Sequence, residues 1–417
     1  MGGVGIAGRF VRKDSRSILR AVDAFCKYHE LLHGFVARGA IKSSLDRGAF
    51  VRPQDLLPED ILQLLGGGRS ESHAYGSECG DLQLRGKIAE LENIRHAARY
   101  SAENVAIMPG AWAALEFALQ EAMALRSGRC ARGNVVVVGP TLYQMFHYPI
   151  ASLGFPTIAL DCVRDSKQRV PRGEECLQAI LGENPRAVVL TNPNNPDGKY
   201  IPTSFLRRLV REAEHAGFFV ILDELQNFFA KRPLRYGSWI NSPNVIRVDS
   251  ASKRYALAEH RVGWVIADES LIGDRTRGIT GRMSGIMGNA PRAANTALLE
   301  ILDREVSAAR GGRDFLREKW LELSHKEALV NSRLREMTVE PIAREGCINA
   351  AVVVPNFRGG DLKLAVELMR RGTLIMPCSG YGCAPSPPTL RVTFAERDEK
   401  ITHAMDCLER ALNASTR

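Results

Sequence analysis

The chain has 417 residues, of which 45% are hydrophobic and 25% are charged, the composition of an ordinary folded globular protein. Its formal net charge is +9, but acidic residues interrupt the basic ones, which favours a solvated surface over a nucleic-acid interface. No apolar stretch is long enough to span a membrane, and Met1 to Phe10 lack the apolar core of a signal peptide. We therefore expect a cytoplasmic protein that binds neither nucleic acid nor membrane.

The nine cysteines are odd in number and scattered along the chain. None forms a CxxC pair, and the spacing of Cys378 and Cys383 only weakly resembles a ligand pair. We expect free thiols in a reducing compartment and no metal site.

The N-terminal region carries apolar side chains at helical spacing over residues 11–39. We interpret residues 1–42 as a helical extension that packs against the body of the protein or across a dimer, with partner binding as the alternative. Residues 40–66 contain turn signals at Asp46-Arg47-Gly48, Pro53 and Pro58, followed by a short helix that ends near Gly66.

Apolar runs alternate with amphipathic helices over the following two hundred residues. Strands are predicted at residues 104–108, 135–138, 157–160, 187–190, 218–222, 245–248 and 263–267. The alternation predicts an α/β fold with a mostly parallel, seven-stranded sheet flanked by helices. Ligands of such sheets bind beyond the carboxyl ends of the strands, so the loops that carry Tyr143, Asn195, Asp223 and Lys253 should converge on one site.

Lys253 lies in the sequence Ser250-Ala251-Ser252-Lys253, directly after a predicted strand, and Arg261 follows eight residues later. A lysine amine in this setting can form a Schiff base with a carbonyl cofactor, while hydroxyl groups and an arginine hold a phosphate. A second anion site is expected at Pro109-Gly110-Ala111-Trp112, where a strand runs into the start of a helix. A lone lysine is usually a solvated surface residue, but these surroundings favour a cofactor site.

The C-terminal third has a different pattern. Residues 292–340 are predicted to be helical, and strands at residues 348–354, 373–376 and 389–394 surround a helix at residues 361–371. We therefore expect a large domain over residues 43–300 and a smaller α+β domain over residues 301–417.

Together these motifs resemble the class I and II aminotransferase family, fold type I enzymes that use pyridoxal 5′-phosphate. The most specific part is the Ser-x-Ser-Lys stretch with Arg261-x-Gly, and Tyr255-Ala256-Leu257-Ala258 is similar to the subgroup of histidinol-phosphate aminotransferases. Asn195-Pro196-Asp197-Gly198 is similar to the family's Asn-Pro-Thr-Gly. The resemblance extends from about Ser43 to the C-terminus, and it implies the fold type I architecture with its cofactor.

The resemblance also implies roles for the cofactor-binding residues. Lys253 would hold pyridoxal 5′-phosphate as an internal aldimine and then move protons at the α-carbon of the substrate. Asp223 would pair with the pyridine nitrogen, although by itself it would serve equally well as a helix cap. Asn195 would donate to the ring hydroxyl, and Tyr143 would stack on the ring, one residue beyond the usual position of the aromatic. The phosphate would be held by Gly110, Ala111, Trp112, Ser250, Ser252 and Arg261.

The same resemblance implies a homodimer and an amino-acid substrate. Tyr75 matches a tyrosine that reaches the phosphate from the neighbouring subunit, and Arg391 matches the arginine that binds the α-carboxylate of the substrate. Gly48 and Asn349 lie where the family frames the substrate.

Three departures from the family pattern leave the reaction type open. Gln226 stands where the family usually has a tyrosine that bonds the ring hydroxyl, Asp197 replaces a threonine, and Arg275–Gly288 reads as a basic, glycine-rich loop that could meet an anionic substrate. The first hypothesis is an aminotransferase acting on an α-amino acid.

The main alternative is pyridoxal-phosphate-dependent replacement, elimination, oxidation or carbon–carbon bond formation, for example on S-adenosylmethionine in specialised biosynthesis. A non-catalytic regulator with a DNA-binding module is a further alternative, but the residues ahead of the core are too few for a winged-helix domain.

Overall fold

The structure is a computed structural model that describes residues 11–13, 15–45, 56–67, 76–125, 133–139, 154, 156–161, 173–228, 230, 234–290, 295–340 and 344–415. Three of the predicted site residues, Gly48, Tyr75 and Tyr143, lie outside the described residues.

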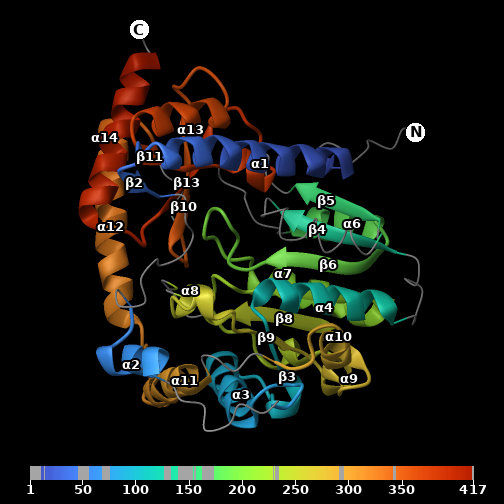
Figure 1. Ribbon diagram of the computed structural model, residues 1–417. Coiled ribbons are helices and arrows are strands. Elements are labelled where there is room, and N and C mark those ends of the chain that lie inside the picture. Colours follow the sequence, from blue (N-terminus) through green and yellow to red (C-terminus); the bar gives the residue numbers. More distant parts are fainter. Residues whose placement is uncertain are drawn as a thin grey trace, which may run out of the picture.

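A mostly parallel sheet forms the centre of the molecule (Figure 1). Its strands lie in the order β1 (Val11–Lys13), β5 (Thr157–Asp161), β4 (Asn134–Gly139), β6 (Pro185–Thr191), β7 (Phe219–Asp223), β8 (Val245–Ser250), β9 (Gly263–Ile266) and β3 (Val105–Met108). The strands from β5 to β8 are parallel, whereas β9 is antiparallel to both of its neighbours. The seven strands predicted from the sequence are therefore all present.

The eighth strand comes from the N-terminal extension. Residues 11–13, which were expected to be helical, form β1 and pair antiparallel with β5 at the edge of the sheet, so the helix prediction was wrong there. The predicted helix begins shortly after, as α1 (Ser15–Ala37). The sequence Val-Arg-Lys has no apolar run that would predict a strand. These residues form a strand because they pair with β5.

The sheet is flanked by helices whose apolar residues complete the core. The described helices of this layer are α2 (Glu59–Gly67), α3 (Leu82–His96), α4 (Ala111–Ala124), α6 (Gly173–Gly182), α7 (Thr203–Ala216), α9 (Glu269–Ile272), α10 (Gly278–Met287) and α11 (Asn295–Arg310). Residues of the central strands, such as Val136, Val188 and Ile221, are almost fully buried, as continuous apolar runs in a parallel sheet require.

The basic segment Arg275–Gly288 is mainly a helix, so its prediction as a loop was wrong. Ile279 and Met283 lie on one face of α10 and are fully buried, and α10 packs against α4. This packing overrides the low helix propensity of the glycines. The guanidinium of Arg282 forms an ion pair with Glu121 at 2.6 Å. This basic side chain therefore already has an acidic partner within the protein and does not wait for an anionic substrate.

The C-terminal part is built around a small antiparallel sheet in the order β10 (Asn349–Val353), β13 (Thr389–Thr393), β12 (Met376–Pro377). The helices α12 (Arg317–Glu336), α13 (Asp361–Arg370) and α14 (Asp398–Ser415) pack around it (Figure 1). The segment predicted as one strand at residues 373–376 is divided, because β11 (Thr373–Leu374) pairs instead with β2 (Ser43–Ser44).

Helix α1 packs mainly on this C-terminal part. It contacts α13 and the short 3-10 helix η5 (Cys378–Tyr381), and in Figure 1 it runs between α13 and the edge of the large sheet. Tyr28 of α1 and Tyr381 of η5 are buried in the same apolar cluster, against which Phe25 and Phe35 also pack. Because β1 belongs to the large sheet, the extension connects the two parts of the molecule.

Candidate active site

Several strands end at the same edge of the central sheet. Thr191 and Asp223 are paired at the ends of β6 and β7, and Asp223 is paired with Val248 near the end of β8. Gly263, at the start of β9, is paired with both Ser250 and Met108. The loop that carries Asn195, the end of β7 at Asp223 and the turn to Lys253 thus meet at one edge, as predicted, whereas Tyr143 lies outside the described residues. The turn at Gly110 lies at the same edge.

Lys253 projects from α8 (Ala251–Arg254), a single helical turn directly after β8, and its side chain is half-buried. Burial and then the positive charges of Arg391 and Arg261 together lower the pKa of its amine to about 8, against the opposing effect of Asp223. Within the described part of the chain, no hydrogen bond or ion pair occupies the amine. The lowered pKa leaves more of the Lys253 amine neutral, and therefore nucleophilic, near neutral pH than in an ordinary lysine.

Asp223 is the last residue of β7 and is buried. Burial raises the pKa of its carboxyl group to about 7, against the effect of hydrogen bonds from the Leu225 N–H, at 3.1 Å, and the Thr191 hydroxyl. The residues that follow form a turn and no helix, so Asp223 is not a helix cap. A cationic partner would restore the charged form of this carboxyl group, which suits a protonated ring nitrogen.

Gly110 and Arg261 form a cradle at the start of α4. Gly110 has φ of 82°, and a Cβ added to it would lie 2.4 Å from Nη2 of Arg261, so the guanidinium rests against the bare backbone. The helix has no side-chain cap, so the N–H groups of Ala111 and Trp112 in its first turn have no intrahelical acceptor. Backbone donors at a helix start beside an arginine suit a phosphate group.

Ser250 and Ser252 lie next to this cradle and are both buried. The Ser250 hydroxyl accepts a hydrogen bond from the N–H of Ser252 at 3.3 Å and caps α8. Its own hydrogen is still available to a phosphate oxygen. In addition to any contact with a phosphate, the Ser250 hydroxyl therefore stabilises the helical turn that carries Lys253.

Arg391 comes from β13 of the C-terminal part and reaches the loop after β6. Its Nη1 lies 3.5 Å from Oδ1 of Asn195, and its guanidinium lies over the ring of Tyr381, 5.2 Å from the ring centroid. The stacking on Tyr381 was not expected from the sequence, because neither Gly380-Tyr381-Gly382 nor its position signals a contact with Arg391. Tyr381 is also buried in the apolar cluster formed with α1, so the N-terminal extension supports Arg391.

Asp197, in place of a threonine, stabilises the turn after Asn195. Its Oδ1 accepts hydrogen bonds from the Asn194 side chain at 2.9 Å and from the Lys199 N–H at 3.2 Å. Gly198 follows with φ of 68°, and a side chain there would collide with the carbonyl oxygen of Gly346. The substitution is accounted for by turn chemistry, without a change of reaction.

Gln226 and Asn349 meet across the site. Nδ2 of Asn349, at the start of β10, donates to Oε1 of Gln226 at 2.9 Å, and both side chains are buried. The two residues predicted to face the ring and the substrate are therefore in direct contact.

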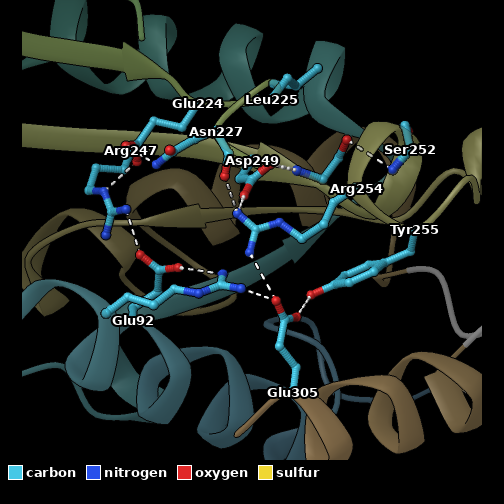
Figure 2. A network of polar contacts seen from close by, with 12 residues as sticks. Glu92, Glu224, Leu225, Asn227, Arg247, Asp249, Ser252, Arg254, Tyr255 and Glu305 are labelled. Carbon is cyan, nitrogen blue, oxygen red and sulfur yellow. Dashed lines mark hydrogen bonds and ion pairs between the residues drawn. The ribbon is translucent and has the colours of Figure 1, made fainter. Parts of the chain in front are cut away.

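A buried network of charged residues lies behind the site and was not predicted (Figure 2). Arg247 of β8 pairs with Glu224 and with Glu92, at 2.5 Å in each case. Glu305 receives hydrogen bonds from Arg95 and Tyr255, and Arg254, Asp249 and Asn227 connect this half of the network to the turn at Lys253. One feature of the sequence could have indicated this network, which is the arginine inside the apolar run Val245-Ile246-Arg247-Val248. A charged side chain in a buried strand is stable only with a buried partner of opposite charge.

Among the described residues, no group of three or more His, Cys, Asp or Glu side chains is arranged to hold a metal ion. Within the same residues, none of the helices combines the length and the apolar character that a membrane span needs.

Comparisons with known proteins agree with this site. The family model for aminotransferase class I and II matches residues 53–408. An aromatic aminotransferase of Arabidopsis thaliana is 28% identical over 332 residues, 78% of this chain and 78% of that protein. A histidinol-phosphate aminotransferase of Cupriavidus pinatubonensis is 28% identical over 277 residues, 65% of this chain and 68% of that protein.

The crystal structure of an aspartate aminotransferase from Thermotoga maritima has a TM-score of 0.75 with this chain at 23% identity, and the match covers 96% of this chain and 100% of that one. At this level of identity the likeness shows the shared fold.

Proposed function

Because the chain belongs to the class I and II aminotransferase family, we propose that it transfers the amino group of an α-amino acid at a site built on Lys253. The members of this family use pyridoxal 5′-phosphate, and the chain is a pyridoxal-phosphate-dependent aminotransferase with the fold type I architecture. Replacement, elimination, oxidation and carbon–carbon bond formation are not favoured by the relatives, which are aminotransferases.

The observation that carries the proposal is the placement of Lys253. Its amine has a pKa lowered to about 8 by burial and by two arginines, and it interacts electrostatically with the buried carboxyl group of Asp223, at the end of the neighbouring strand β7. When bound, pyridoxal 5′-phosphate supplies the aldehyde and the electron-withdrawing ring that make amino-group transfer possible. Lys253 acts as the nucleophile toward that aldehyde and as the base and acid that moves the proton of the substrate α-carbon.

The neighbouring residues hold the cofactor. Asp223 holds the ring nitrogen in its protonated form, while Asn195 and Gln226 offer hydrogen-bonding groups to the ring hydroxyl. The phosphate is bound by the cradle of Gly110 and Arg261 and by donors from Ala111, Trp112, Ser250 and Ser252. We assign Tyr143 to the ring face on the family pattern.

Arg391 binds the α-carboxylate of the substrate. A guanidinium offers two parallel N–H donors to a carboxylate, and the stacking on Tyr381 fixes its plane. Gly48 completes the substrate side of the site in this proposal, whereas the fully buried side chain of Asn349 contacts Gln226.

We further propose that the active unit is a homodimer in which Tyr75 of one subunit reaches the phosphate of the other. The support is the resemblance of the Tyr75 segment to the family pattern. The relatives act on aromatic amino acids, aspartate and histidinol phosphate, so a screen of amino donors should begin with these classes.

Reconstitution with pyridoxal 5′-phosphate tests the site. Wild-type protein should acquire the visible absorption of a lysine-bound cofactor, and borohydride reduction should attach the cofactor to the peptide that contains Lys253. Lys253→Ala should lose both signals, whereas Lys199→Ala, which removes a lysine from the nearby turn, should keep them. Attachment at another lysine would refute the assignment.

A further inference from the structure

The contact between Gln226 and Asn349 joins two distant parts of the chain. Gln226 lies three residues after Asp223, in the turn that follows β7, whereas Asn349 opens β10 of the C-terminal part. Asn349 donates through Nδ2 to Oε1 of Gln226 at 2.9 Å, and the exposed fractions of the two residues are 4% for Gln226 and 0% for Asn349. A hydrogen bond between neutral amides at this depth is shielded from competition by water.

This hydrogen bond determines which end of the Gln226 amide is available. An amide side chain has an acceptor end and a donor end, and Asn349 occupies the acceptor. Within the described residues, no group accepts a hydrogen bond from Nε2 of Gln226. Nε2 is also not among the buried polar atoms that lack a partner, so it borders accessible space. Gln226 therefore presents N–H donors to whatever fills the site.

Asn349 is itself held rigidly. Its backbone N–H donates to Sγ of Cys347 at 3.3 Å, and it is paired with Thr393 across the small sheet. The N–H of Cys347 in turn donates to the carbonyl of Phe228 at 2.9 Å, only two residues after Gln226. Hydrogen bonds thus join the backbone near Asn349 to the backbone near Gln226, and they fix the relative position of the two side-chain amides.

We propose that Asn349 is a positioning residue for amino-group transfer, because it orients Gln226 so that Nε2 donates to the ring oxygen of bound pyridoxal 5′-phosphate. This inference rests on the proposed function and deepens it. Gln226 then supplies a neutral N–H donor at the position where the family usually has the phenol of a tyrosine. Its donor end is held toward the cofactor because Asn349 binds its acceptor end. A donor at this oxygen favours the form of the bound cofactor that has lost a proton, so loss of the donor should raise the pKa of the bound cofactor.

The test is a spectroscopic pH titration of the cofactor-loaded protein. Asn349→Asp keeps the size of the side chain, but an ionised carboxylate offers no donor to Oε1 of Gln226, so the amide should turn and give Nε2 to the aspartate. We expect the pKa of the cofactor absorbance to rise by about one unit. Gln226→Leu should produce a similar rise, because it removes the donor directly.

Two further variants separate orientation from charge. Asn349→Leu removes the donor without adding charge and should still raise the pKa of the cofactor absorbance. In the Gln226→Leu background, Asn349→Asp should add only the smaller shift that its charge produces, so the effects of the two single variants should not add.

The outcomes distinguish this inference from the proposed function. If the wild type binds pyridoxal 5′-phosphate and the Asn349 variants change only the thermal stability, Asn349 has a merely structural role and the inference is overturned. Fully additive shifts in the double variant would also contradict it. If the wild type acquires no cofactor absorption, the proposed function itself fails.

Discussion

The guanidinium of Arg391 acts on two groups at once. It binds the substrate carboxylate in the proposed function, and its charge is the second largest cause, after burial, of the lowered pKa of Lys253. In the proposed function, the same residue therefore couples substrate recognition to the reactivity of the amine.

Arg391→Gln should raise the pKa of the Lys253 amine above its value of about 8, because one of the two nearby positive charges is lost. Only the neutral amine attacks an aldehyde, so incorporation of pyridoxal 5′-phosphate should reach half of its maximal rate at a higher pH. The measurement is the rate of incorporation into apoprotein as a function of pH. Arg391→Lys keeps the charge and should leave the midpoint nearly unchanged. An unshifted midpoint in the glutamine variant would contradict the account.

The positions of individual candidate residues were predictable where they depend on local sequence. Lys253 and Asp223 follow apolar strands directly, and parallel strands bring such positions to one edge. The contact of Gln226 with Asn349 was not predictable, because 123 positions separate them and each alone is an ordinary polar residue. The same holds for Tyr381 beneath Arg391.

At the scale of elements, the buried network fixes the strands that carry the site. Arg247 of β8 bridges Glu224, in the loop after β7, and Glu92 of α3, and all three side chains are buried. Glu224 directly follows Asp223, so the ion pair also holds the end of β7 in place. A buried pair of this kind is costly to break because the remaining charges lose their partner.

Arg247→Met should lower the free energy of unfolding by about 3–5 kcal/mol, because the buried carboxyl group of Glu224 loses its cation and that of Glu92 keeps only longer contacts with Arg95 and His96. Urea denaturation at a fixed protein concentration measures the loss. Arg277→Met provides the matched control, since Arg277 pairs with Asp274 at 3.3 Å on the exposed surface, where an ion pair contributes about 0–1 kcal/mol. Equal losses in the two variants would show that the buried network does not stabilise the sheet.

The sequence predicted elements well where one pattern dominates. Each of the seven core strands is an apolar run bounded by turn residues, and α7 is one of the amphipathic helices expected between them. The secondary-structure prediction was wrong where tertiary contacts, and not the local sequence, determine whether a segment is a helix or a strand. β1 is a strand only because it pairs with β5, and α10 is helical despite its glycines because its apolar face packs on α4.

At the scale of the whole molecule, the N-terminal extension connects the parts that form the site. β1 lies in the large sheet and α1 packs on the C-terminal part, while β2, which directly follows the extension, pairs with β11. We propose that the described part of the N-terminal extension, residues 11–13 and 15–42, links the large domain of residues 43–300 to the small domain of residues 301–417. The extension supports Arg391 through Tyr381.

The proposed dimer predicts complementation between two inactive variants. Tyr75→Ala lacks the group donated to the neighbouring site, and Lys253→Ala lacks the nucleophile of its own site. A mixed dimer contains one site with both defects and one intact site, so refolding an equal mixture should restore roughly a quarter of wild-type activity. Activity that stays at the level of the separate variants would show that Tyr75 acts within its own subunit or that no such dimer forms.

The most direct test of the central claim is a single-turnover reaction of the cofactor-loaded protein with an accepted amino acid. The account predicts that each active site converts its pyridoxal 5′-phosphate to pyridoxamine 5′-phosphate and releases one equivalent of the corresponding keto acid. The absorbance and the products are measured together in the absence of an amino acceptor, and addition of a keto acid should restore the starting spectrum. Consumption of the amino acid with full recovery of pyridoxal 5′-phosphate and no matching keto acid would contradict transamination.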